Sequence, residues 1–353
     1  MKKISDYLSQ AVASGAANVY IAAGAPVSAG REGGIEPLDD ERLHPSNTEK
    51  LIEELYALAG RDMEAYRVQL QDSFSFSQPG LARFWVSAYW QRRSLAAALK
   101  ILPFTIPDWQ KLGIPQAVMD LTGLGRGLVL LSGPKGSGRA TTMACMVDSV
   151  KRSRACHIVT VEDPIQYLHK NDRSMISQLE LGTDTVSYAA AMRSCLSQTA
   201  EVVFLGGIPD LETLGLCITA AETGRLVVAA LPVRGTARSA AHLIRLTDAL
   251  PEAEREQALF QLSRLLGGAA SQQLLPLRDG GAGTAFEIMP VDGTVRELIR
   301  AGDAHRLAGT PVTGKDAVSM DQAISRLYQE GKLSLETALS YADNPDQLRR
   351  RLG

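Results

Sequence analysis

The chain has 353 residues, of which 45% are hydrophobic and 22% charged, and its formal net charge at pH 7 is −2. These proportions are typical of a globular protein long enough to form two or three domains. The near-neutral balance lacks the basic excess of nucleic-acid-binding proteins, so we expect no nucleic-acid partner. The four cysteines show no paired spacing and the five histidines no metal-ligand spacing, which predicts reduced thiols and no metal bound by these residues.

The N-terminus begins with two lysines but does not resemble a signal peptide. Ile4, Leu8 and Val12 recur at helical spacing, and polar residues interrupt the stretch between them, which predicts an amphipathic helix. No stretch reaches the about 18 apolar residues that a membrane span needs. We therefore expect no direct membrane insertion.

Residues 1–98 are predicted to form a small α+β domain. After the first helix, the pattern predicts a strand at 17–22, a helix at 46–59, and two antiparallel strands at 72–76 and 82–90. Residues 99–115 contain Pro103, Pro107 and Pro115 without a sustained period, which is typical of a linker.

Residues 116–353 change to an α/β pattern and are predicted to form the second domain. Apolar strands are predicted at 127–132, 157–161, 201–205, 225–231 and 285–289, with helices at 141–152, 187–197, 211–223 and within 318–351. Alternation of this kind favours a mostly parallel sheet with right-handed crossovers.

The first of these strands leads into a glycine-rich loop and a helix, the arrangement that holds phosphate on backbone N–H groups. The candidate nucleotide-binding residues are Gly133, Pro134, Lys135, Gly136, Ser137, Gly138, Arg139, Ala140, Thr141 and Thr142. The phosphate-loop pattern ends in Gly-Lys-Ser/Thr, whereas here Arg139 and Ala140 follow the last glycine. Two hypotheses follow: a nucleotide or anion site, or a glycine turn that serves only the fold.

Several further motifs occur in order and at matching separations. They are Gly15-Ala16-Ala17-Asn18-Val19-Tyr20, Val161-Glu162-Asp163-Pro164-Ile165, Ala191-Met192-Arg193-Ser194, Asp210-Leu211-Glu212-Thr213 and Ala221-Glu222-Thr223-Gly224. Together with the loop they resemble the type II/IV secretion ATPase superfamily and, within it, the type IV pilus retraction (twitching-motility) ATPases. The resemblance implies a PAS-like α+β N-terminal domain before a RecA-like P-loop core.

The resemblance also implies ligands and partners. ATP and Mg²⁺ would be the cofactors, and the chain would form a cytoplasmic homo- or hetero-hexamer with a paralogous ATPase. That ring would lie at the inner membrane on a pilus platform protein.

The same resemblance suggests further site residues. Glu162 would orient or activate the attacking water and Asp163 would act near Mg²⁺; alternatively, the two acids only cap a strand end. Arg193 would reach a γ-phosphate, or pair with Glu162 or Asp163. Arg83, Arg92 and Arg93 would contact nucleotide in a neighbouring subunit, or form a solvated charge cluster on an edge strand.

The chain departs from the family pattern at seven positions, most of which carry chemistry. They are Arg139 for the loop lysine, Ala140 for the magnesium-binding hydroxyl, Gly207 for the Walker B glutamate, Gln166 for a second acid, Ser197 for an arginine, and Arg225 and Pro232 for two histidines. We therefore predict a pseudo-ATPase with weak or lost hydrolysis. The alternative is an active motor with Arg139 as cation, Glu162 as base, and Thr141 or water on Mg²⁺.

Overall fold

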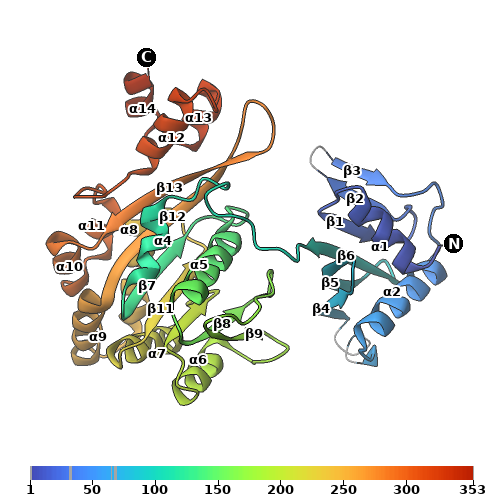
Figure 1. Cartoon of the computed structure of the whole chain (residues 1–353), viewed down its shortest axis with the longest axis horizontal. Helices are drawn as coiled ribbons and strands as arrows, with labels where there is room; N and C mark the ends of the chain where they lie inside the picture. Colours follow the sequence, from blue (N-terminus) through green and yellow to red (C-terminus); the bar gives the residue numbers. More distant parts are fainter. Residues whose placement is uncertain (1, 32–33, 65, 67–69, 353) are drawn as a thin grey trace. The chain divides into compact units, whose positions relative to one another are not determined.

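The structure of the protein is a computed structural model that describes residues 2–31, 34–64, 66 and 70–352 (Figure 1). The chain divides into two compact units. Unit 1 comprises Met1–Thr105 and Gln166–Leu168, and unit 2 comprises Ile106–Ile165 and His169–Gly353. Among the helices that are described, none is both long and apolar enough to cross a membrane.

Unit 1 is an antiparallel sheet with helices, which confirms the predicted α+β class. Its elements are α1 (Ile4–Ala13), β1 (Asn18–Ile21), β2 (Ser28–Arg31), β3 (Gly34–Pro37), α2 (Pro45–Ala59), β4 (Gln71–Gln78), β5 (Ala82–Gln91) and β6 (Ser94–Leu102). The strand order is β3-β2-β1-β6-β5-β4. Tyr7 and Leu8 of α1 and Leu51 of α2 belong to the same buried cluster as Val86 and Leu99 of the sheet.

The domain boundary differs from the predicted one. β6 continues to Leu102, so the first four residues assigned to a linker form strand, paired with β5 up to Leu102↔Arg83. The strand is mostly alanine and leucine and is buried on both sides, so it lacks the alternation by which a strand is recognised. Ile106, Trp109 and Leu112, also assigned to the linker, pack on a core cluster of unit 2.

Unit 2 is built on a seven-stranded sheet in the order β13-β12-β7-β11-β10-β8-β9. Its strands are β7 (Gly127–Ser132), β8 (His157–Glu162), β9 (Met175–Glu180), β10 (Val202–Leu205), β11 (Leu226–Leu231), β12 (Leu266–Pro276) and β13 (Ala282–Pro290). All neighbours are parallel except β12 and β13. This confirms the predicted mostly parallel core; β9 and β12 are strands that the sequence pattern did not predict.

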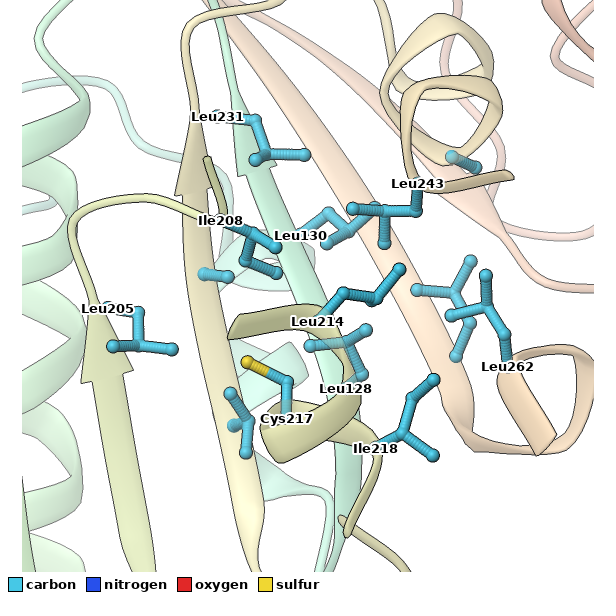
Figure 2. Packing of buried hydrophobic residues seen from close by; sticks show 14 of the residues in the cluster. Leu128, Leu130, Leu205, Ile208, Leu214, Cys217, Ile218, Leu231, Leu243 and Leu262 are labelled. Atoms are coloured by element: carbon cyan, nitrogen blue, oxygen red, sulfur yellow. The ribbon is translucent and has the colours of Figure 1, made fainter. Parts of the chain in front are cut away.

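Helices cover both faces of this sheet. They are α4 (Gln116–Asp120), α5 (Arg139–Ser153), α6 (Tyr188–Ser197), α7 (Leu211–Glu222), α8 (Thr236–Leu246), α9 (Glu252–Leu265), α10 (Gly293–Arg300), α11 (Ala304–Gly309), α12 (Met320–Gln329), α13 (Leu335–Tyr341) and α14 (Pro345–Leu352). Val129 and Leu131 of β7 face α4 and α5, whereas Leu128 and Leu130 face α7, α8 and α9. Figure 2 shows this second side, where Leu214 of α7 packs among the leucines.

Buried leucines of this kind stabilise the core by about 2 kcal/mol each. The central strands are hydrophobic along their whole length because both of their faces are covered. The last three helices pack with Leu275 of β12 and Ala285 of β13 in a smaller cluster. The sheet is therefore a rigid base for the loops at its edges.

Candidate functional site

The candidate site lies at the edge of the sheet where the parallel strands end. Ser132, Glu162 and Leu205 are the last residues of β7, β8 and β10, and parallel strands direct their carboxyl ends to one edge. Ligands of open α/β sheets bind at this edge. The sheet order therefore gathers the glycine loop, the acidic motif and Gly207 on one side of unit 2.

The glycine loop joins β7 to α5, and two of its glycines are required by the surrounding backbone. Gly133 has a φ of 151°, and a Cβ added there would overlap the carbonyl oxygen of Gln272. Gly138 caps α5 with a φ of 89°, and an added Cβ would lie 2.9 Å from the Gln272 amide nitrogen. Gly138 has no side-chain oxygen that could accept hydrogen bonds from the first N–H groups of α5. These N–H groups are therefore available to bind an anion.

Gln272 of β12 holds the loop from behind. Thr142, in the first turn of α5, donates its hydroxyl to Gln272 Oε1 at 2.7 Å, and both side chains are buried. The residue thus contacts both ends of the loop. The sequence pattern did not identify Gln272 because it did not predict β12. The signal in the sequence was the polar run Ser271-Gln272-Gln273 between apolar residues.

Arg139 takes the place of the phosphate-loop lysine. Its guanidinium donates from Nη1 to the carbonyl oxygen of Pro134 at 2.9 Å, so the side chain folds back across the loop. Partial burial lowers the pKa of Arg139 below its usual value, since the surroundings disfavour its charged form. A positive charge is thus present at the loop, on a wide planar group rather than a slim ammonium.

The residues present fit a polyphosphate but do not fit Mg²⁺ at its usual place. Ala140 carries a methyl group where a hydroxyl would ligate the ion. Thr141 is rotated about 100° further around the helix. Within the described ranges, no cluster of three or more His, Cys, Asp or Glu side chains is arranged to hold a metal.

Glu162 ends β8 beside the polar side chains of its neighbours. Its Oε1 accepts hydrogen bonds from the Thr160 hydroxyl at 2.8 Å and from the Gln178 amide at 3.3 Å. Thr160 and Gln178 are paired residues of β8 and β9, so Glu162 is held toward β9. Asp163 follows and is exposed, whereas Glu162 is partly buried.

Tyr188, the first residue of α6, lies against the two glycines after β10. A Cβ added at Gly206 would be 2.8 Å from Tyr188 Oη, whereas one at Gly207 would be 3.5 Å from the ring, an ordinary contact. Burial, and then the charges of Asp163 and Glu162, raise the pKa of Tyr188 to about 12. The phenol therefore stays protonated at neutral pH and can donate a hydrogen bond but not act as a base.

Comparison with known proteins identifies the family. The family model described as "Type II/IV secretion system protein" matches residues 103–338. The chain belongs to this family. Within it, the chain belongs to the type IV pilus retraction ATPase family: it is 30% identical to PilT of Pseudomonas aeruginosa over 97% of this chain and 99% of that protein.

Two further comparisons agree with this family assignment. A twitching motility protein of Neisseria gonorrhoeae is 35% identical over 80% of this chain and 76% of its own length. The crystal structure of the pilus retraction motor PilT with bound ADP matches with a TM-score of 0.86 and 37% identity, covering 99% of this chain and 100% of that one.

The arginines of this retraction ATPase homologue are placed as follows. Arg193 forms an ion pair with Glu212 of α7. Contact with a γ-phosphate, or a pair with Glu162 or Asp163, stays a prediction. Arg225 donates from Nε to the Ala200 carbonyl at 2.9 Å and from Nη2 to that of Leu196, which ties it to the end of α6. Both side chains connect helices and strands of unit 2.

The three arginines of unit 1 differ from one another. Arg83 is only 7% exposed and donates to Ser75 Oγ at 2.7 Å, so a solvated surface cluster does not describe it. Arg92 and Arg93 are exposed and form the tight turn between β5 and β6, with φ values of 47° and 63°. Contact with a neighbouring subunit's nucleotide stays a prediction for all three.

Proposed function

We propose that this pilus retraction ATPase homologue is a nucleotide-binding ring subunit whose ATP hydrolysis is weak or lost. One observation carries the proposal: Gly133 and Gly138 keep the positive φ values of a tight loop, whereas Arg139, Ala140 and Gly207 stand where the family pattern has the groups that perform the chemistry. The ADP bound to the PilT structure of the same fold supports nucleotide as the ligand.

The size of the catalytic loss follows from what each group does. Phosphoryl transfer depends on positioning and on neutralising charge in the transition state. Removing a group that activates the attacking water, here at Gly207, costs about 10²- to 10⁴-fold in rate. Arg139 and Ala140 act on the same transition state as Gly207, so the three rate effects need not be additive. Each of them alone would slow the reaction.

The proposal extends to the assembly. A ring subunit without hydrolysis would need an active paralogue beside it to supply movement, so we favour a mixed hexamer over a ring of this chain alone. Such a ring would lie in the cytoplasm against the inner-membrane platform protein of a pilus. The subunit would then act as a structural or regulatory element.

A second candidate function is an active motor with a rearranged site. The position of Glu162, held at the strand end by Thr160 and Gln178, is the observation that favours it, because a fixed carboxylate can orient water. In that case Arg139 would neutralise the phosphates, and Thr141 or water would ligate Mg²⁺.

Two measurements on the purified full chain separate these functions. A thermal-shift titration with ATP tests binding, since a ligand of the folded state raises the melting temperature with its concentration. Phosphate release at saturating ATP and Mg²⁺ tests turnover. The proposal expects binding without turnover; turnover that Glu162→Gln abolishes would establish the active motor, and no binding at all would leave a scaffold.

A further inference from the structure

The glycine loop already carries a cation of its own. Arg139 begins α5, and its guanidinium reaches back over the loop to the Pro134 carbonyl at 2.9 Å. This bond uses one of the five N–H donors of the guanidinium. A guanidinium presents the others as a fork that matches two phosphate oxygens at once.

A second group inside the loop has an unused hydrogen-bonding capacity. The hydroxyl of Ser137 is buried, with the residue 3% exposed, and Oγ makes no hydrogen bond to the described part of the chain. It lies inside the turn, because a Cβ at Gly133 would be 2.5 Å from it. Buried hydroxyls normally have a partner, so this one favours an acceptor brought to the loop.

The loop and its surroundings offer little to a divalent metal ion. Mg²⁺ at a phosphate loop is held by one or two protein oxygens in addition to phosphate and water. Ala140 supplies none, and Gly207 removes the carboxylate from the end of β10. A cationic fork is therefore present at the loop, whereas the hydroxyl at position 140 and the carboxylate at position 207 are absent.

We propose that the loop binds a nucleotide whose polyphosphate carries no metal ion. The Arg139 guanidinium then contacts the phosphate oxygens that would otherwise bind Mg²⁺. This inference rests on the proposed function and specifies the ligand of that site. On binding, Arg139 exchanges the Pro134 carbonyl for phosphate, and Ser137 gains an acceptor. Magnesium then competes with the protein for the nucleotide instead of bridging the two.

The test is calorimetric titration of the full chain with ADP, in EDTA and in excess MgCl₂ at matched ionic strength, since salt alone screens charge. We expect ADP to bind with a higher affinity in EDTA than in Mg²⁺, because magnesium competes with the protein for the nucleotide. An affinity in Mg²⁺ equal to or higher than that in EDTA would overturn the inference and leave the proposed function standing. Absence of binding in both buffers, with cooperative melting intact, would overturn both.

Three variants make the result specific. Ala140→Ser restores a metal-binding hydroxyl and is expected to make Mg²⁺ raise ADP affinity at least threefold. Arg139→Gln should lower affinity in EDTA at least tenfold. The matched control is Arg152→Gln, at the far end of α5 with its side chain 71% exposed, which should leave affinity unchanged. Unchanged affinity in Arg139→Gln would contradict the role of the guanidinium.

Discussion

At the scale of single residues, the loop depends on close backbone approaches that only glycine allows. Gly133 combines a positive φ with the Gln272 carbonyl directly in front of its α-carbon. A side chain there would have to displace the backbone of β12, which is paired on both sides, with β13 and β7. The glycine therefore fixes the distance between the loop and the strand behind it.

Gly133→Ala is expected to destabilise the protein by about 2 kcal/mol or more, because strain and overlap combine. It should also abolish ADP binding. Gly293→Ala is the matched control, since Gly293 begins α10 in open space. Chemical unfolding and calorimetry measure the two effects; a Gly133→Ala protein that binds ADP normally would contradict the account of the loop.

His169 gives the protein a specific response to acid. Burial, and then the charge of Lys151, lower the pKa of His169 to about 4, and Asp148 opposes this shift. The folded state thus favours neutral histidine, whereas the unfolded chain takes up a proton near pH 6.5. At pH 7.5 the histidine is neutral in both states and does not lower the free energy of unfolding. That free energy decreases as the pH falls from about 6.5 toward 4.

We expect this histidine to account for about 2 kcal/mol of the stability difference between pH 7.5 and pH 5. His169→Gln should shrink that difference, and His305→Gln, at an exposed histidine, should not. Urea unfolding of the three proteins at both pH values is the measurement. Equal pH dependence in His169→Gln and wild type would rule out this origin.

At the scale of elements, the loop between β11 and α8 is fastened to the last helices. Arg234 donates from Nη2 to the Tyr341 carbonyl at 2.6 Å and pairs with Asp343 at 3.0 Å. Asp321 of α12 accepts from the backbone N–H groups of Asp343 and Asn344. The junction of α13 and α14 is thus held to the sheet edge that carries the candidate site.

Arg234→Gln is expected to loosen this junction locally. A partly exposed charged hydrogen bond contributes about 1 kcal/mol, which corresponds to about fivefold faster amide exchange in residues 341–352. Hydrogen–deuterium exchange with mass spectrometry measures it. Arg350→Gln, on the exposed side of α14, is the control; equal exchange in both variants would show that Arg234 does not hold the helices.

The elements also show why part of the fold was predictable. β7, β8, β10 and β11 are short apolar runs, so hydrophobicity alone located them. β12 was missed because Gly267 and Gly268 precede a polar run, and its identity depends on pairing with β7 far away in the sequence. The glycine loop was recognisable locally.

Two parts of the site required the three-dimensional structure. Gln272 meets Thr142 across 130 residues of sequence, and no local pattern joins them. Tyr188 reaches Gly207 only through the packing of α6 against β8 and α7. The pairing of Arg193 with Glu212 similarly depends on how α6 and α7 meet.

At the scale of the whole molecule, the chain divides into two compact units and matches the structure of the pilus retraction motor PilT over 99% of its length. Arg139, Ala140 and Gly207 all lie at the carboxyl edge of the sheet. The proposed loss of hydrolysis rests on these three residues at one place, within a fold whose sheet and cores are retained.

Steady-state phosphate release by the full chain tests this claim most directly, comparing the wild type with the triple variant Arg139→Lys, Ala140→Ser and Gly207→Glu. Gly207 has room for a side chain, because an added Cβ makes only an ordinary contact with Tyr188. We expect the wild type to match the protein-free background and the variant to exceed it at least tenfold. Wild-type turnover equal to or above that of the variant would contradict the account.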